Sequence, residues 1–391
     1  NADKRVPVTP TNQKLVLAQL HSLIVGGSVN ANALPANVKE AVQKAASELK
    51  RAGSNGVLVS GIQDVNAQTV VLEINEALNS KAFDTKTPIK TRQGNVKAVQ
   101  TLISDMKAGK VGALIMSGVN PLYTLPNASE FEAGLASVDL SVAFSLKEDE
   151  TSTKAGYIAA EPHYLESWGD VEMKKGHYSL MQPTIRPIFN TRQFQESLLK
   201  WAGNDVSYHD YIKQTWESTV LGGSSWNTAL HDGVFVGNGN VTVETDEDAV
   251  PFAASNEDTE PVNAEATVAS VSSSVNKLAG ATANGMEITL YPKTGMGDGR
   301  QANNPWLQEL PDPLSRACWD NYLTMSAATA RDLGITNWNV SNGALNGNMV
   351  NITVNGTTLN NVPVMIQPGQ AIGSVAMAVG YGRTAAGKCG D

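Results

Sequence analysis

The fold is decided by residues 96–144, VKAVQTLISDMKAGKVGALIMSGVNPLYTLPNASEFEAGLASVDLSVAF, in which helical and strand patterns alternate. The spacing of apolar residues predicts helices at Val96–Ala108 and Ala128–Leu135. Short apolar runs at Val111–Met116 and Leu140–Phe144 predict buried strands. Strands that alternate with helices in this way are typical of a parallel sheet covered by helices.

The same alternation extends toward the N-terminus. Helical patterns at Lys14–Val25 and Asn37–Arg51 come first. An apolar run at Gly56–Gly61 then predicts a strand, and Asn66–Leu78 has the pattern of a helix. We therefore expect residues 1–242 to form one α/β domain with a parallel, Rossmann-like sheet.

Beyond this repeat the patterns weaken. Residues 145–192 are polar with little periodicity, which predicts a long irregular segment of functional or interfacial use. Helices are expected again at Thr191–Trp201 and Tyr208–Thr219. Residues 243–285 contain an acidic run and then a stretch rich in Ala, Ser, Asn and Thr, which indicates a linker or surface excursion.

The last hundred residues have a β pattern. Asn355-Gly356 is the two-residue signal of a hairpin, and Ala327–Leu333 is the one expected helix, ended by Gly334. The pattern of residues 286–391 is therefore typical of a small β-barrel or sandwich, and we expect a β-barrel domain. Its strands are predicted at Glu287–Tyr291, Met349–Val354, Val362–Ile366 and Ser374–Val379.

Composition excludes several classes of protein. The 29 Lys and Arg against 38 Asp and Glu give a net charge of −9, which argues against nucleic-acid binding. The two cysteines, Cys318 and Cys389, are too few to ligate an iron–sulfur cluster or a Cys-rich zinc site. No apolar run reaches the length of a membrane span. Since the sequence starts with Asn1, we expect it to be a segment of a longer chain.

Three motifs could carry chemistry. The loop Gly118–Pro126 follows a predicted strand, where ligands bind in open α/β sheets, although a rigid turn with one packed tyrosine is the commoner role of such a loop. Glu148–Thr151 could bind a cation, but a solvated loop is the commoner role of such a run. His163 and Glu166 could act as base and orienter, but no nucleophile motif accompanies them. The glycines near Gly61 do not form a dinucleotide-binding motif.

Several motifs together resemble the molybdopterin oxidoreductase superfamily. They include the strand and loop from Gly109 to Pro126, Leu165–Asp170 with Gln182–Pro187, and the run Asn303–Pro313, NNPWLQELPDP. Further similarity lies at Ala330–Ile335, Gln367–Gly369 and Gly380–Arg383. Within the superfamily the sequence is most similar to the large iron–sulfur subunit of bacterial alternative complex III.

This resemblance implies a molybdoenzyme-like fold in a respiratory quinol:electron-acceptor oxidoreductase at the periplasmic face of the inner membrane. It implies a cofactor-free scaffold, with iron–sulfur clusters in a region outside this sequence and no molybdopterin, metal or catalytic residue here. Expected partners are a multiheme cytochrome c and quinol-site membrane subunits. The stretch Pro162–Pro187 could dock such a neighbour, and packing between domains of this chain explains it equally well. The positions expected to line a vestigial cofactor cleft are Asn120, Trp306, Gln308 and Gln367.

Two other interpretations stay open. An active bis-pterin molybdenum oxidoreductase of the polysulfide or thiosulfate reductase type would use the same four residues beside its cofactor. A soluble binding protein with a Rossmann-like core would make the Asn303–Pro313 match coincidental. The molybdenum content of the protein separates the first of these from a scaffold.

Overall fold

The computed structural model describes residues 2–29, 34–84, 86–91, 94–237, 270–341, 343 and 345–390. The chain divides into two compact units. Unit 1 comprises Asn1–Asp84 and Asn256–Tyr381, and unit 2 comprises Thr85–Ser255 and Gly382–Asp391. This division differs from the sequential domains predicted at 1–242, 243–285 and 286–391, because the N-terminal helices pack with later parts of the chain.

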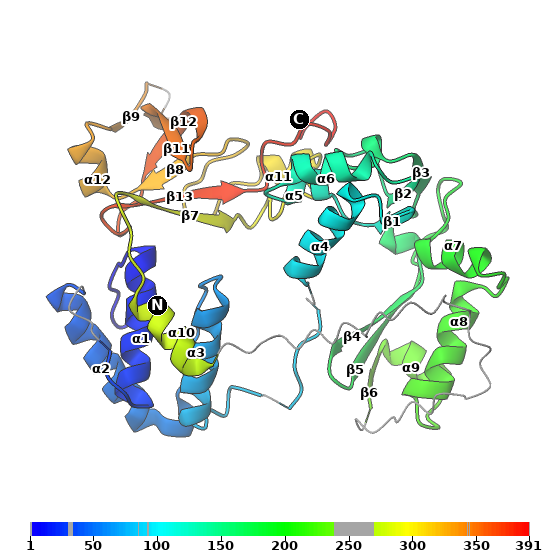
Figure 1. The fold of residues 1–391 in the computed structure, drawn as a ribbon, viewed down its shortest axis with the longest axis horizontal. Helices are drawn as coiled ribbons and strands as arrows, with labels where there is room; N and C mark the ends of the chain where they lie inside the picture. Colours follow the sequence, from blue (N-terminus) through cyan, green and yellow to red (C-terminus); the bar gives the residue numbers. More distant parts are fainter. Residues whose placement is uncertain are drawn as a thin grey trace. The chain divides into compact units, whose positions relative to one another are not determined.

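The N-terminal part of unit 1 is a group of four helices (Figure 1). The helices share an apolar core to which three of them contribute side chains that are at most 1% exposed. These side chains are Ala18, Val70, Ile74 and Leu278. The fourth helix of the group, α10, lies within residues 243–285, which were predicted to be a linker or surface excursion. The residues 238–269 lie outside the described part of the chain. The helices are α1 (Pro10–Ile24), α2 (Ala36–Ala52), α3 (Val65–Ala77) and α10 (Val271–Ala279).

The strand predicted at Gly56–Gly61 is not formed. A 3-10 turn, η1 (Gly53–Asn55), precedes this segment. The backbone of Leu58 then bonds to a side chain instead of to a neighbouring strand: its N–H donates to Asn75 Oδ1 at 2.7 Å, and its carbonyl accepts from Asn75 Nδ2 at 2.8 Å. Asn75 is 2% exposed on α3. The buried side-chain amide of Asn75 therefore satisfies the backbone hydrogen-bonding groups of Leu58, in a segment that the apolar pattern alone predicted to be a strand.

Replacing Asn75 with alanine is expected to lower the free energy of unfolding by about 1–3 kcal/mol, because both buried backbone groups of Leu58 lose their partner. Urea unfolding followed by circular dichroism measures this loss. Glu76→Ala, at the exposed neighbouring position of the same helix, is the control and should unfold as the wild type does. An Asn75→Ala protein as stable as this control would contradict the assigned role.

The second part of unit 1 is a five-stranded mixed sheet in the order β11-β12-β8-β13-β7. Within the described residues it is an open sheet, and no pairing joins its edge strands β11 and β7 into the closed barrel that was expected. The turn Asn355-Gly356 joins β11 and β12 as predicted, with φ of 50° and 84°. The strands are β7 (Glu287–Pro292), β8 (Leu323–Met325), β11 (Met349–Val354), β12 (Thr357–Ile366) and β13 (Ser374–Val379), accompanied by α11 (Pro305–Glu309), α12 (Ala327–Asp332), β9 (Asn337–Asn339) and β10 (Leu345–Gly347).

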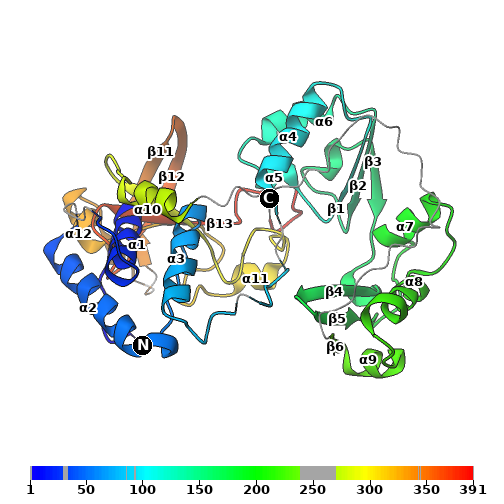
Figure 2. The same ribbon diagram turned by 60° about the horizontal axis from the view of Figure 1, so that its bottom comes forward.

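Unit 2 contains the parallel sheet that residues 96–144 predict. Its order is β1-β2-β3, and both pairs of strands are parallel. Figure 2 shows α4 and α6 on one face of this sheet, where Met106 and Phe131 are buried. The elements are α4 (Val96–Lys107), β1 (Ala113–Ser117), α5 (Pro121–Thr124), α6 (Ala128–Leu135), β2 (Leu140–Ser145), η2 (Ser152–Lys154) and β3 (Tyr157–Ala160).

The rest of unit 2 is more regular than residues 145–192 predicted. Two antiparallel strands, β4 (Gly169–Lys174) and β5 (His177–Met181), occupy part of that segment and pair with β6 (Val234–Val236). The short polar strands have no strong alternation, and pairing with the distant β6 is invisible to local patterns. The helical elements that follow are α7 (Phe194–Trp201), α8 (Tyr208–Thr215), the π-helical turn η4 (Trp216–Val220) and α9 (Trp226–Asp232). No helix in the described ranges has the length and apolarity that a membrane crossing requires.

Candidate functional site at the carboxyl end of the parallel sheet

The carboxyl ends of β1, β2 and β3 lie along one edge of the sheet, where open α/β folds place their ligands. β1 ends at Ser117, and the left-handed Gly118 (φ 62°) turns the chain into the loop that precedes α5. β2 ends at Ser145 and leads to the acidic run Glu148–Thr151. This edge thus brings together the two loops that the sequence marked as candidates.

Asn120 is one of the four predicted cleft residues, and both the oxygen and the nitrogen of its side-chain amide form hydrogen bonds. Its Oδ1 accepts from the backbone N–H of Thr151 at 3.2 Å and from the Thr151 hydroxyl at 2.6 Å. Its Nδ2 donates to Glu150 Oε2 at 2.7 Å. Thr151 is 1% exposed, and its Oγ1 also accepts from the N–H of Leu122 at 3.0 Å. Asn120 therefore fastens the loop after β1 to the loop after β2.

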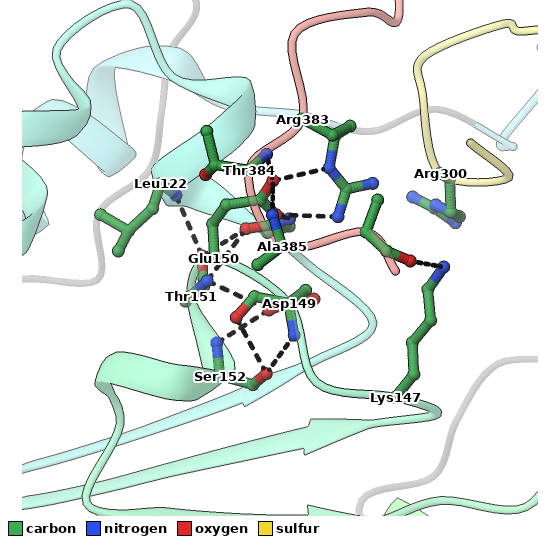
Figure 3. Close-up of polar contacts among 12 residues, drawn as sticks. Leu122, Lys147, Asp149, Glu150, Thr151, Ser152, Arg300, Arg383, Thr384 and Ala385 are labelled. Atoms are coloured by element: carbon green, nitrogen blue, oxygen red, sulfur yellow. Dashed lines mark hydrogen bonds and ion pairs between the residues drawn. The ribbon is translucent and has the colours of Figure 1, made fainter. Parts of the chain in front are cut away.

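Glu150 forms a buried ion pair with Arg383, which comes from the C-terminal segment of the same unit (Figure 3). The Arg383 guanidinium donates from Nε to Oε1 and from Nη2 to Oε2, each at 2.8 Å. The side chains of Arg383 and Glu150 are 3% and 10% exposed. Two parallel bonds of this kind are the strongest form of a carboxylate–guanidinium contact.

The C-terminal segment is further fixed around the same carboxylate. The N–H groups of Thr384 and Ala385 donate to Glu150 Oε1 at 2.8 and 3.1 Å (Figure 3). Lys147 Nζ donates to the carbonyl of Ala386 at 3.3 Å. The guanidinium of Arg383 also lies 4.7 Å from the centre of the Tyr123 ring. Glu150 is thus the anchor of the segment 382–391 within unit 2.

The charge state of Glu150 follows from these bonds. Burial alone would raise the pKa of its carboxyl, but hydrogen bonds from Arg383, Asn120 and Thr384 outweigh burial and hold that pKa well below its ordinary value. The bond to Glu150 also raises the pKa of Arg383. The pair is therefore ionised at neutral pH. For Glu150, this corrects the expectation of a solvated acidic loop.

Sequence reasoning missed this pair because its two members are 233 residues apart. The run Glu148–Thr151 was noted for its charge, but nothing in it indicated a partner. Gly380–Arg383 was noted only as part of the family resemblance. The pairing of the two segments is a property of the tertiary structure.

A second carboxylate lies at the end of β3. Glu161 accepts a hydrogen bond from the Ser117 hydroxyl at 3.3 Å. Burial raises the pKa of Glu161, although bonds from Ser117 and from the N–H of Phe194 act in the opposite direction. Since Phe194 is the first residue of α7, this carboxylate lies at the N-terminus of that helix, where a negative charge is favourable.

The other predicted cleft residues belong to unit 1. Trp306 is 82% exposed on α11, whereas Gln308 is buried and donates to the carbonyl of Ala302 at 3.0 Å. Gln308 lines a cavity of about 220 Å³, and Gln367 lines a different one of about 470 Å³. Within unit 1, the structure therefore does not gather these residues around one cavity.

The pair His163 and Glu166 has a local structural role. His163 Nδ1 accepts from the N–H of Leu165 at 3.3 Å, and Glu166 Oε2 accepts from the N–H of His163 at 2.8 Å. Together they form a capping box on the 3-10 turn η3 (Tyr164–Glu166). Within the described residues, no group of three His, Cys, Asp or Glu side chains is placed to hold a metal ion.

A pterin dinucleotide is the cofactor expected of active members of the molybdopterin oxidoreductase superfamily. Any phosphate held at this sheet edge would face the Glu150 carboxylate, and like charges at short range repel. The Asn120 amide and the Arg383 guanidinium, which could otherwise bind phosphate, hold partners in the chain. The residues at the ends of β1 and β2 do not fit the group.

Comparisons with known proteins agree with the fold. No family model matches the chain. The chain is similar to the molybdopterin-binding-like subunit of menaquinone reductase from Nitratidesulfovibrio vulgaris, with 31% identity over 121 residues. This match covers 28% of the chain and only 18% of the relative.

Among solved structures, acetylene hydratase from Pelobacter acetylenicus superimposes with a TM-score of 0.55 and 12% identity. The match covers 96% of this chain and 64% of that protein, so the chain spans less than two thirds of either relative. The similarity extends over almost the whole chain and includes both units. The comparisons and the parallel sheet of unit 2 together confirm the predicted α/β, molybdoenzyme-like fold.

Proposed function

We propose that the chain is a segment of a subunit of a quinone-linked respiratory oxidoreductase of the alternative complex III type. In this role it is a cofactor-free scaffold, and iron–sulfur clusters elsewhere in the subunit carry the electrons. The carboxyl edge of the parallel sheet carries the proposal, because Asn120, Glu150 and Arg383 close it with bonds to one another. The similarity to a menaquinone reductase subunit supports the respiratory assignment.

The proposal extends to location and partners. We place the subunit at the periplasmic face of the bacterial inner membrane, held there by quinol-site membrane subunits and beside a multiheme cytochrome c. The protein contributes placement and environment to the redox centres rather than chemistry of its own. A rigid scaffold suits that role, and a buried bidentate ion pair is a device for rigidity.

The second candidate is an active bis-pterin molybdenum oxidoreductase of the polysulfide or thiosulfate reductase type. The molybdoenzyme-like fold favours it, since acetylene hydratase shares that fold over most of this chain. The two candidates differ in what the purified protein contains.

Elemental analysis of the native complex, purified from membranes with the full-length subunit, tests the proposal. We expect iron in stoichiometric amount, and molybdenum and tungsten at background. Cells are grown with molybdate, and a resident molybdoenzyme purified in parallel confirms that metal was supplied. One molybdenum or tungsten per subunit would overturn the scaffold and support the second candidate.

A further inference from the structure

Unit 1 buries a lysine whose charge has no close counterpart. Lys293 is the residue that follows β7 in the sequence, and it is 7% exposed. Its Nζ donates to the carbonyl of Asp320 and to the hydroxyl of Tyr381, each at 3.2 Å. The same Nζ lies 4.0 Å from the centre of the Tyr322 ring and 5.0 Å from that of Tyr381. Its immediate contacts are thus a carbonyl, a phenol and two ring faces.

No carboxylate lies within 4.0 Å of Lys293 among the described residues. Burial lowers the pKa of Lys293, although Asp312 and Asp320 act at longer range to raise it. Asp312 is itself held by other donors, the N–H groups of Leu314 and Ser315, each at 2.9 Å. Buried charges in proteins are normally paired, because an unpaired one is strongly destabilising.

An open cavity of about 220 Å³ adjoins this lysine. Most of its walls are apolar, Tyr381 and Gln308 add polar groups, and both Lys293 and the Asp312 carboxylate line it. Its volume lies below the range of roughly 300–1,000 Å³ typical of drug-sized ligands, so it suits a molecule with a single ring. The apolar walls are Met296, Leu307, Leu310, Pro311, Pro313, Ala317 and Trp319.

The loop that forms one wall is strained. Arg316 and Trp319 have φ of 64° and 63°, a left-handed conformation that is costly for bulky side chains. Such strain persists where the surroundings impose it, and it is concentrated at ligand-binding sites. The backbone N–H of Trp319 donates to the carbonyl of Gln308 at 2.8 Å, which fixes Trp319 in this wall.

We propose that this cavity binds a small aromatic carboxylate. The carboxylate would pair with the Lys293 ammonium, and the ring would lie against the apolar wall that includes Trp319. An anion supplies a counter-charge in direct contact with Lys293, whereas Asp312 is engaged by the N–H groups of Leu314 and Ser315 and acts on the lysine only at longer range. The apolar walls select a flat apolar body. The site lies wholly within unit 1, so this proposal is independent of the function proposed from the sheet edge of unit 2.

Calorimetric titration of the purified chain with benzoate, benzamide and benzylamine tests the charge requirement without any substitution. We expect benzoate to bind about tenfold or more tightly than benzamide, as a charged hydrogen bond to an ammonium implies, and benzylamine not to bind. Equal binding of benzoate and benzamide, or no benzoate binding, would overturn the proposal.

Lys293→Met then assigns the charge to its residue. We expect benzoate affinity to fall about tenfold or more. The increase in melting temperature that benzoate causes in the wild type should disappear as well. Lys277→Met, an exposed position on α10 of the same unit, should bind benzoate as the wild type does. A folded Lys293→Met protein that still binds benzoate at wild-type affinity would contradict the proposal and show that Lys293 has only a structural role.

Discussion

Replacing Arg383 with methionine is expected to lower the free energy of unfolding by about 3–5 kcal/mol, one of the two largest effects expected for this chain. The reason is that Glu150 then remains as a buried carboxylate without its counter-charge, still facing the N–H groups of Thr384 and Ala385. Release of the C-terminal segment should accompany the loss. Chemical unfolding followed by circular dichroism measures the first effect, and limited proteolysis near Thr384 the second.

Matched variants separate the ion pair from general damage. The double variant Glu150→Gln, Arg383→Met removes both charges and is expected to recover part of the loss, because no isolated charge stays buried. Glu130→Gln breaks the exposed pair with Lys107 in the same unit, which should contribute at most about 1 kcal/mol. If Arg383→Met were no more destabilising than Glu130→Gln, Glu150 would not be the anchor described above.

The depressed pKa of Glu150 gives a pH dependence of definite sign. A carboxyl whose pKa is lower in the folded state stabilises the protein fully above its unfolded pKa, about 4.3 for glutamate. That stability is lost as the pH falls from there toward the folded pKa. We therefore expect wild-type stability to decline more steeply between about pH 5 and pH 3 than that of Glu150→Gln. Parallel slopes would contradict the ionised, bonded state of Glu150.

Replacing Trp216 with alanine is expected to lower the free energy of unfolding by about 3–5 kcal/mol, the second large effect. Trp216 is fully buried in the π-helical turn η4. Its ring centre lies 6.0 Å from those of Tyr178 and Trp226 and 6.5 Å from that of Phe235. It therefore joins strands β5 and β6 to helix α9, and its loss leaves a large cavity.

Trp216→Phe divides this effect into packing and hydrogen bonding. The indole N–H donates to Asp170 Oδ2 at 2.8 Å, and phenylalanine removes that bond, worth about 1 kcal/mol, together with only part of the ring volume. The loss should therefore be clearly smaller than for alanine. Trp201→Ala, at a half-exposed position of the same unit, is the control for loss of a tryptophan. Equal losses for Trp216→Phe and Trp216→Ala would show that the hydrogen bond dominates.

Local patterns predicted the elements whose stability is local. In the segment 96–144, helices α4 and α6 and strands β1 and β2 were predicted within two residues of their bounds, since apolar periodicity there matches the face that each element buries. The short helix α5 was expected to be a loop. The turn Asn355-Gly356 was equally readable, because its two left-handed residues are a requirement of the backbone itself. The open, mixed character of the C-terminal sheet was not, because pairing partners follow from the whole chain.

The candidate site was only half visible in the sequence. The loop from Gly118 to Pro126 and the acidic run at Glu148–Thr151 were recognisable, because each follows a strong strand and strand ends form ligand sites. The roles of Asn120 and Glu150 were not, because their partners come from separate loops and from the C-terminal segment. The predicted roles of Trp306, Gln308 and Gln367 beside a cleft stay predictions.

By itself, then, the sequence determined the parallel α/β core of unit 2, the β character of the last hundred residues and the hairpin between β11 and β12. These depend on periodicity and turn chemistry, which act over a few residues. Only the tertiary structure decided that the backbone of Leu58 bonds to Asn75, that α10 returns to the N-terminal helices and that Arg383 neutralises Glu150. Each of these contacts satisfies a buried group across a long stretch of chain, and burial exists only once the chain is folded.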